Sequence, residues 1–179
     1  MAHRVPGRVL RGVAAILVTG VALAACATGD LAGISVWGDN KLQPAEISDV
    51  DTYPADRALR QARAHFRNGD FGYSATLYKR LVEIEPNNPE GYIGLSASYD
   101  RLRRFDLSDR GYAAWYGLSG GTAQYYNNLG YSYLLRGDLS VALANLQKAK
   151  KLAPDSPVVA NNLRLLADIS AGRPPRPRA

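Results

Sequence analysis

A period of 34 residues organises most of this 179-residue chain. Shifting the sequence against itself by 34 positions aligns aromatic, leucine and asparagine residues, which is the signature of a repeat protein. Tyr92, Leu95 and Tyr99 recur as Tyr126, Leu129 and Tyr133, and Asn127-Asn128-Leu129 recurs as Asn161-Asn162-Leu163. The period predicts three contiguous units, 55–88, 89–122 and 123–156, followed by a half-unit over 157–172.

Each unit is expected to form two amphipathic helices, and the third unit shows the pattern most clearly. The first helix of that unit has one face at positions i, i+3, i+4 and i+7, made by Tyr126, Leu129, Gly130 and Tyr133. Gly137-Asp138 interrupts this helix. A second apolar stripe follows at Ala142, Leu146 and Ala149, and Pro154 ends the unit. The small Gly130 and Ala142 are expected where the paired helices approach most closely.

This pattern resembles the tetratricopeptide repeat family. The residues of unit three listed above carry the resemblance, from the aromatic Tyr126 and the Leu129-Gly130 pair to Pro154. The resemblance implies an all-α fold, an α-solenoid of three tetratricopeptide-type helix pairs plus a C-terminal capping helix. It further implies that the first helix of each pair lines the concave face of a right-handed arc.

The other two units follow the family pattern less closely. Unit one keeps it at Ala62, His65, Ser74, Tyr78, Leu81 and Pro86. Unit two has Ser96 and Ser108 at the small positions, Gly120 in place of the terminal proline and Trp115 where a small residue belongs. A glycine inside a helix costs about 1 kcal/mol relative to alanine. Gly111 therefore predicts a short second helix in unit two, and Trp115 predicts a wider gap before unit three.

The C-terminal region is expected to close the stack. Ser156-Pro157 suits the start of a helix, because proline is tolerated at the first helical position. Ala160, Leu163 and Ala167 are expected to form the inner face of this cap, which covers the last hydrophobic edge of a solenoid. Residues 173–179, rich in proline and arginine, predict a disordered basic tail.

The N-terminus has the pattern of a bacterial export signal. Arg4, Arg8 and Arg11 precede an apolar stretch of about 14 residues, which is shorter than the roughly 20 that span a bilayer. Leu23-Ala24-Ala25-Cys26 then resembles the lipobox of bacterial lipoproteins. The resemblance implies a signal peptide over 1–25 and a diacylglycerol on Cys26, the only cysteine; the alternative is a plain signal peptide in which Cys26 is an ordinary small residue. Ala27, in place of aspartate, favours the outer membrane by the same resemblance.

Residues 26–54 are expected to form a flexible tether between the lipid and the repeats. Glycine and proline recur along the segment, and no helical period persists in it. A short strand around Ile34–Trp37, packed on the first helices, is the alternative.

The net charge of +6 does not indicate nucleic-acid binding. Three arginines belong to the signal and three, Arg173, Arg176 and Arg178, to the tail. Residues 26–172 hold 16 basic and 16 acidic residues, so the chain between the signal and the tail carries no net charge.

No catalytic or metal site is predicted, and no cofactor is expected. Gly117-Leu118-Ser119-Gly120-Gly121 fits the G-x-S-x-G pattern, but a nucleophile elbow needs a strand before it and a downstream histidine, and none follows. A glycine-rich helix end explains the motif, and a serine hydrolase using Ser119 remains the alternative. His65 is interpreted as a hydrogen-bonded core or groove residue, and Arg136-Gly137-Asp138 as a turn.

The concave face is the predicted binding site for an extended peptide. Amide side chains both donate and accept hydrogen bonds, as a peptide backbone requires, and arginines bind carboxylates. The predicted groove residues are Arg60, Arg63, Asn127, Asn128, Tyr131, Asn161 and Asn162. Asp100, at the twelfth position of unit two, and Gln124, at the second position of unit three, are expected on the same face. Asparagine is also usual at one of these positions in the family, and the arginines could simply be solvated.

The combination of lipobox, spacer, three repeats and cap resembles the tetratricopeptide lipoproteins of the Tad (tight adherence) Flp-pilus assembly system. The runs 127–138 and 161–166 carry this resemblance. It implies a non-catalytic, pilotin-like scaffold at the periplasmic face of the outer membrane, with a secretin or another pilus component as its protein partner. A scaffold for envelope or outer-membrane protein assembly is the alternative.

Overall fold

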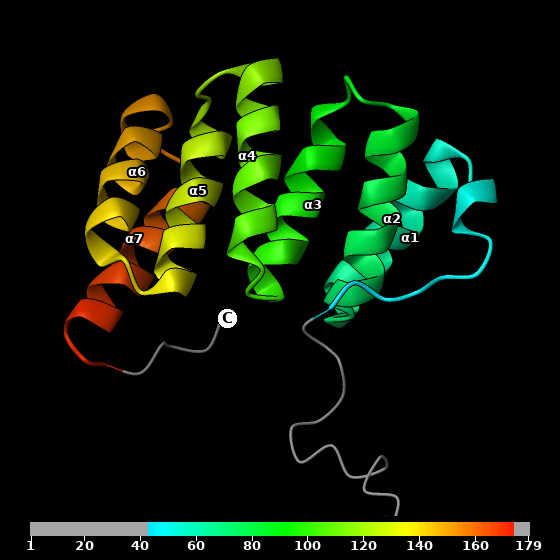
Figure 1. The fold of residues 1–179 in the computed structure, drawn as a ribbon. Helices are drawn as coiled ribbons and strands as arrows, with labels where there is room; N and C mark the ends of the chain where they lie inside the picture. The colour runs from blue at the N-terminus through cyan, green and yellow to red at the C-terminus, as the bar shows by residue number, and fades with distance from the viewer. Residues whose placement is uncertain (1–42, 174–179) are drawn as a thin grey trace, which may run out of the picture. The chain divides into compact units, whose positions relative to one another are not determined.

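The computed structural model describes residues 43–173, and these residues form helices and connecting segments without a strand (Figure 1). A short 3-10 helix, η2 (Val50–Thr52), precedes seven α-helices. These are α1 (Ala55–Asn68), α2 (Phe71–Ile84), α3 (Pro89–Arg101), α4 (Phe105–Ser119), α5 (Ala123–Arg136), α6 (Leu139–Leu152) and α7 (Pro157–Ser170). The all-α prediction is confirmed. The predicted signal peptide, Cys26 and the tail beyond residue 173 lie outside the described residues.

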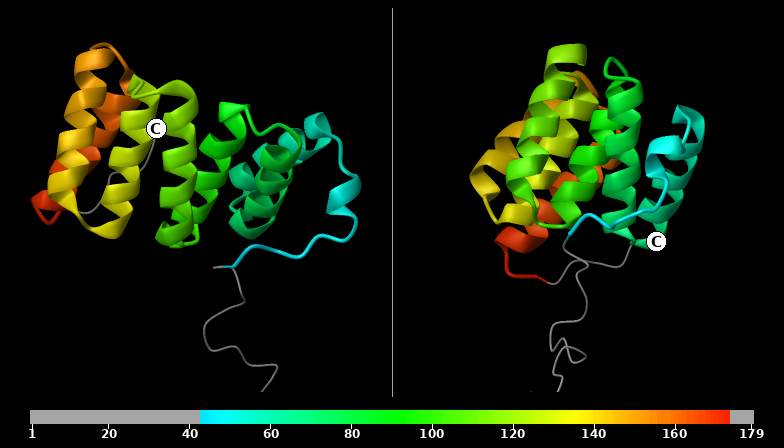
Figure 2. Two further views of the ribbon diagram at one scale, coloured as in Figure 1. Left: turned by 45° about the horizontal axis from the view of Figure 1, so that its top comes forward. Right: turned by 45° about the vertical axis from the view of Figure 1, so that its right-hand side comes forward.

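The helices pair as antiparallel hairpins that stack side by side (Figures 1 and 2). Within the compact unit 38–179, each predicted repeat contains one hairpin: α1 with α2, α3 with α4, and α5 with α6. The first helices α1, α3, α5 and α7 also approach one another in sequence along the stack. They therefore form a continuous layer, as the solenoid prediction requires, and α7 closes the row beside α5 and α6.

Small residues set the distance between paired helices. A Cβ added to Gly130 would lie 2.8 Å from Leu146 Cγ and 3.2 Å from the carbonyl oxygen of Ala142, so α5 and α6 touch through backbone here. In the second hairpin, a Cβ on Gly111 would collide with Ser96 Oγ. The expectation of a short helix around Gly111 is wrong: α4 has 15 residues and is the longest described helix. Close packing against α3 needs a residue without a side chain at this position.

Trp115 fills the space between the second and third repeats. Its side chain is 1% exposed and packs edge-on against Tyr125, with ring centroids 5.3 Å apart. The backbones of α4 and α5 approach at fewer positions than those of α2 and α3. The predicted wide gap is therefore present, and aromatic side chains occupy it.

The turns inside the three hairpins share one backbone shape. Gly69 and Gly137 end α1 and α5 with φ of 84° and 83°, the left-handed conformation that favours glycine. Arg103 occupies the equivalent turn of the second repeat with φ of 57°. A left-handed conformation costs a residue with a Cβ roughly 1–2 kcal/mol. The middle repeat bears this cost, because it holds an arginine where its neighbours hold glycine.

The capping helix α7 buries a different face from the one expected. Val159, Asn162 and Leu166 are buried, whereas Ala160 and Ala167 are exposed. The 34-residue shift gives the reason, since Ala160 and Ala167 match Tyr126 and Tyr133 of α5. Those positions in α5 lie on the face toward its partner helix, and α7 has no second helix among the described residues. Arg164, at the position of Gly130, is exposed on the same face.

The end of the predicted tether packs on the repeats. Thr76 Oγ1 donates to the carbonyl of Ala45 at 2.6 Å, and a Cβ on Gly72 would lie 2.5 Å from the carbonyl oxygen of Gln43. Arg80 reaches the carbonyls of Asp51 and Tyr53. Residues 43–53 are therefore held along α2, because side chains of α2 donate to their carbonyls and Gly72 leaves room for the backbone of Gln43. The prediction of a flexible tether is wrong for this stretch; residues 26–42 lie outside the described residues.

Asp100 joins three helices through a buried polar network. Its side chain is 3% exposed, and its carboxylate accepts hydrogen bonds from Ser108 and Ser132, each at 2.6 Å, and from Tyr112 at 2.9 Å. The Tyr112 hydroxyl also lies 3.1 Å from the carbonyl of Asn128. The expectation that Asp100 faces a ligand is wrong, because this buried carboxylate ties α3 to its paired helix α4 and to α5 of the next repeat.

Stability should depend on the charge of Asp100. Burial raises the pKa of Asp100, and the hydrogen bonds from the two serines and Tyr112 together with the Arg136 charge lower it by less. A carboxyl whose pKa is raised on folding stabilises the fold when protonated. The free energy of unfolding, measured with denaturant, should therefore fall as the pH rises from the ordinary aspartate pKa of about 4 through the raised pKa of Asp100. Asp100→Asn should lack this fall while exposed Asp155→Asn keeps it; parallel curves for all three proteins would contradict the prediction.

Candidate functional site

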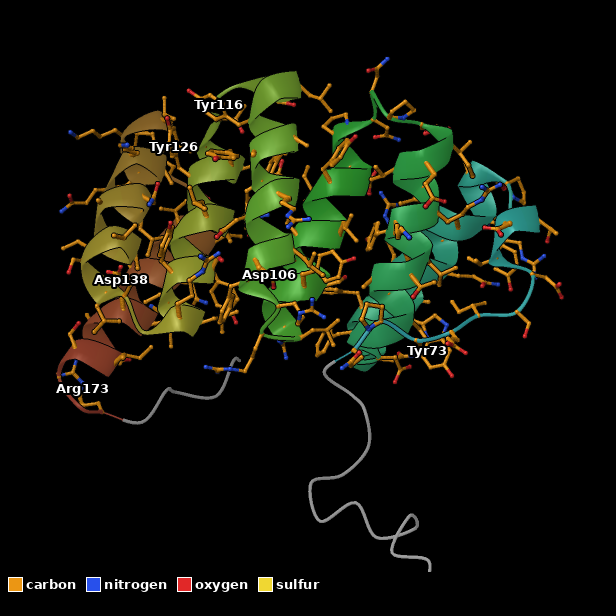
Figure 3. All side chains as sticks on the ribbon, viewed as in Figure 1. Tyr73, Asp106, Tyr116, Tyr126, Asp138 and Arg173 are labelled. Carbon is orange, nitrogen blue, oxygen red and sulfur yellow. The ribbon has the colours of Figure 1, made fainter. Side chains whose placement is uncertain are left out.

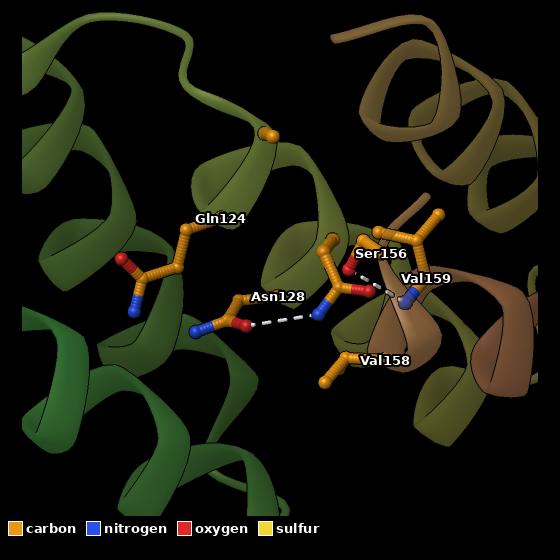
Figure 4. A pocket seen from close by; sticks show the side chains of 7 residues that line it. Gln124, Asn128, Ser156, Val158 and Val159 are labelled. Carbon is orange, nitrogen blue, oxygen red and sulfur yellow. Dashed lines mark hydrogen bonds between the residues drawn. The ribbon is translucent and has the colours of Figure 1, made fainter. Parts of the chain in front are cut away.

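A depression between the first turns of α5 and α7 is the candidate binding site (Figure 4). It has a volume of about 280 Å³ and lies in the layer of first helices. We call it the amide pocket. It is lined by Ala123, Gln124, Asn127, Asn128, Ser156, Val158 and Val159. No lining residue is charged, so the pocket suits a neutral segment of a ligand.

Local sequence places both helix starts at this pocket. The Thr122 side chain accepts from the backbone N–H of Tyr125, which begins α5 at Ala123. The Ser156 side chain accepts from the backbone N–H of Val159, and Pro157 occupies the first turn of α7. These side-chain caps satisfy backbone donors that helix starts leave free. The two first turns are thereby fixed next to each other, and their side chains line the pocket.

A relay of amide hydrogen bonds forms the floor of the pocket. Asn162 Nδ2 donates to Asn127 Oδ1 at 2.9 Å, and Asn127 Nδ2 donates to Asn128 Oδ1 at 3.2 Å. Asn127 and Asn162 are each 7% exposed. The pair that recurs at the 34-residue spacing therefore joins the third repeat to the cap, and its amide groups are used within the protein.

The rim of the pocket keeps groups available to a ligand. Asn128 has its oxygen engaged by Asn127, while its Nδ2 donor forms no hydrogen bond among residues 43–173. Gln124 is exposed, and its amide likewise has no partner within that range. Val158 is 58% exposed beside them. The rim therefore offers a donor from Asn128, both a donor and an acceptor from Gln124, and one apolar contact (Figure 4).

The structure separates the other predicted groove residues from this pocket. Arg60 and Arg63 lie on α1, where Arg60 pairs with Asp56 at 2.5 Å and Arg63 pairs with Glu90 of α3. Tyr131 is half-buried on α5 against the core that holds Leu134. Asn161 on α7 accepts from Arg164 at 2.8 Å. The structure thus brings Asn127, Asn128 and Asn162 together and leaves Arg60, Arg63, Tyr131 and Asn161 outside the lining of the pocket.

The first and second repeats offer a more closed surface than the third. The Tyr78 ring covers Gly94 so closely that a Cβ on this glycine would overlap it. Tyr78 is 6% exposed, and the ion pair between Arg63 and Glu90 lies near its hydroxyl. The open polar face is therefore concentrated at α5 and α7.

The motifs with catalytic resemblance are not assembled into an active site within residues 43–173. Ser119 is exposed at the end of α4 and forms no hydrogen bond with a histidine there. His65 lies half-buried on α1, with Nδ1 3.2 Å from Asp70 and its ring 5.1 Å from that of Tyr73. The same residues contain no group of three or more side chains able to hold a metal ion.

No helix within residues 43–173 has the length and apolar character needed to cross a bilayer.

Comparison with known proteins supports the repeat fold. Residues 123–156 match the family described as Tetratricopeptide repeat. The structure is similar to the NMR structure of the first TPR domain of human RPAP3, with a TM-score of 0.58 and 19% identity over 66% of this chain and 93% of that one. It is also similar to the first TPR of Spaghetti (RPAP3) bound to the HSP90 peptide SRMEEVD, with a TM-score of 0.55 and 19% identity over 66% and 96%. No curated protein matches the sequence. The fold is a tetratricopeptide-type α-solenoid.

Sequence reasoning missed the half of the pocket that α7 supplies. Ser156 was expected to begin the cap, but Val158 and Val159 carry no repeat signal because the corresponding residues of α5 are Gln124 and Tyr125. The Ser156-Pro157 helix start could have indicated this, because it places Val158 and Val159 in the first turn of α7, beside α5.

Removal of the Asn162 amide should destabilise the fold. Asn162→Ala leaves the buried Asn127 Oδ1 without a donor, which costs about 1–3 kcal/mol. Gln124→Ala removes an exposed side chain with no described hydrogen bond and should change stability by less than about 0.5 kcal/mol. Denaturant unfolding of the two variants checks the difference. Equal stability in both would show that the relay between α5 and α7 contributes nothing.

Proposed function

We propose that this protein is a non-catalytic tetratricopeptide scaffold that binds an extended segment of a protein partner in the amide pocket. The observation that carries the proposal is the partly satisfied amide relay. Asn128 and Gln124 are positioned by a rigid helix layer and keep hydrogen-bonding capacity directed away from the fold. A solved structure with a similar fold holds a peptide of HSP90, which supports a peptide as the type of ligand.

The chemistry of the rim favours the backbone of the ligand over charged side chains. Asn128 Nδ2 can donate to a peptide carbonyl, and Gln124 can pair with both a carbonyl and an N–H group. The exposed Val158 adds contact with an apolar side chain. The two cations of the predicted groove, Arg60 and Arg63, are engaged with Asp56 and Glu90. A neutral, extended stretch with a small or apolar side chain is the ligand that this surface accommodates.

The cellular setting of the proposal rests on the N-terminal sequence. Leu23-Ala24-Ala25-Cys26 supports lipid attachment at Cys26, and two or more acyl chains give stable anchoring where one is marginal. Ala27 supports the outer membrane, with the repeats in the periplasm. The runs that resemble the Tad system support a pilotin-like role in Flp-pilus assembly, in which the pocket holds a segment of the secretin or another pilus component.

Partner capture should depend on the Asn128 donor. Asn128→Asp keeps an oxygen to accept from Asn127, so the relay survives, but it replaces the outward donor with a negative charge that repels a carbonyl. A photo-crosslinking residue in place of Gln124 should capture a secretin or another pilus component from native membranes, and Asn128→Asp should reduce the yield several-fold. Asn87→Asp, on the turn after α2, is the matched control and should leave the yield unchanged. Equal yields with both variants would move the binding site away from the pocket.

Membrane attachment should depend on the thiol of Cys26. Cys26→Ser removes the lipid acceptor, so the protein should leave the membrane fraction for the soluble one or accumulate with its signal uncut. Fractionation after a salt wash, with the mass of the N-terminal peptide of the wild type, provides the measurement. A Cys26→Ser protein that still fractionates with washed membranes in its cleaved form would contradict the anchor.

A further inference from the structure

An edge of the helix stack carries arginines without acidic partners. The turns inside the three hairpins and the end of α7 lie along this edge; Figure 3 shows Tyr73 and Arg173 there and Tyr116 and Tyr126 at the opposite one. Around the first two turns, Arg67, Arg101 and Arg103 are all exposed. Within residues 43–173 no carboxylate pairs with any of the three. We call these residues the arginine patch.

The other arginines of this edge have acidic partners. Arg104 pairs with Asp106 at 3.4 Å, and Arg173 pairs with Asp168 at 2.8 Å. Arg136 forms two hydrogen bonds to the Asp109 carboxylate. The remaining acids there also have local contacts, since Asp70 lies against His65 and Asp138 caps α6. The arginines of this edge that have no acidic partner are therefore those of the arginine patch, beside α1, α2 and α3.

The patch combines guanidinium groups with aromatic rings. The Arg101 guanidinium lies 4.2 Å from the centroid of Phe71, and the Arg103 guanidinium lies 5.7 Å from that of Phe105. Arg67 and Arg101 line a common depression of about 390 Å³ together with Phe66 and Phe71. Contact with the rings holds the arginines at the surface without neutralising their charge. The edge also exposes 46% of Tyr73, a residue type that suits a membrane interface.

The backbone at Arg103 gives a second reason to assign this edge a role. Arg103 adopts the left-handed conformation that Gly69 and Gly137 adopt in the neighbouring repeats. Strained backbone of this kind is concentrated at functional sites. Here the strain directs an arginine side chain outward from the same turn that positions Arg101.

The N-terminal segment reaches the repeats at this same edge. The carbonyl of Gln43 packs on Gly72, in the first turn of α2 and next to Tyr73. Residues 27–42 connect that point to Cys26, and a fully extended chain of this length spans at most about 60 Å. A lipid on Cys26 therefore keeps the first turn of α2, and with it the arginine patch, within about 60 Å of the membrane surface.

We propose that the arginine patch rests on the anionic phospholipid headgroups of the membrane that holds Cys26. This inference rests on the proposed lipid anchor. Lipid anchoring limits the distance of the repeats from the bilayer, and the patch orients them because basic side chains are attracted to anionic headgroups within a Debye length. The opposite edge then faces away from the bilayer. Its turns 85–88, 120–122 and 153–156 carry Glu85 and Asp155 but no arginine, and the last turn of α6 beside them carries Lys150 and Lys151.

Two engineered cysteines can test this orientation in the mature protein. Lipidation consumes the only native thiol, so Asn68→Cys at the patch and Asn87→Cys at the opposite edge each give one site for a fluorescent probe. The protein is placed in vesicles of phosphatidylethanolamine and phosphatidylglycerol that contain a headgroup-labelled quencher. The probe at residue 68 should be quenched several-fold more than the probe at residue 87. High salt or vesicles of phosphatidylcholine should remove most of the difference.

Variants separate charge from structure. Arg67→Gln with Arg101→Gln and Arg103→Gln should bring the two probes to similar quenching. Lys151→Gln with Lys148→Gln and Arg110→Gln removes equal charge elsewhere and should keep the difference between the probes. Arg103→Gly should raise the melting temperature, because it relieves the turn, and yet lower quenching at residue 68. Equal quenching at both edges, or a difference that persists without anionic lipid, would overturn the proposal. Such a result would favour an acidic protein partner for the patch.

Failure of the arginine patch to bind the membrane can be distinguished from the absence of a lipid on Cys26. The mass of the N-terminal peptide shows whether Cys26 carries lipid. If it does not, Cys26→Ser protein with the same probes is added to the vesicles from solution. Greater quenching at residue 68 on phosphatidylglycerol would then support the patch without the anchor, and equal quenching at both residues would overturn it.

Discussion

The close approach of two helices at positions without bulky side chains is the constraint on which this structure depends. Gly130 lets α5 contact the backbone of α6, and Gly111 makes room for Ser96 between α3 and α4. Because each hairpin is built this way, the hairpins stack with their first helices in one layer. That layer brings the first turns of α5 and α7 together and creates the amide pocket. The pocket is thus a consequence of helix spacing, and the residues that create the spacing lie elsewhere.

Much of the fold could be predicted from the sequence because the 34-residue period is local information. Helix pairs, their turns at Gly69 and Gly137, and the wide gap at Trp115 all follow from patterns within one or two units. The length of α4 could not be predicted in this way. Gly111 is unfavourable for an isolated helix, and its benefit becomes apparent only when Ser96 lies opposite.

The candidate site was only partly predictable, for a related reason. The recurrence of asparagine identifies residues of interest, but it does not say whether their amides face a ligand or each other. The hydrogen bond from Asn162 to Asn127 joins positions 35 residues apart, and it uses amide groups that a ligand would otherwise contact. Asp100 is a similar case, since its partners Ser108, Tyr112 and Ser132 come from two other helices. A repeat pattern specifies which residues share a face of a helix, whereas the hydrogen bonds between two helices depend on how those helices pack together.

The exposed face of α7 has a consequence for self-association. A stack of identical building blocks has an open end, and an open end with small residues would accept another helix from a second molecule. Arg164 stands where Gly130 permits close contact in the preceding helix, and it holds a solvated charge at that point. A neighbouring helix would have to desolvate that charge without gaining a partner for it. The arginine at this position therefore opposes end-to-end joining through the exposed face of α7.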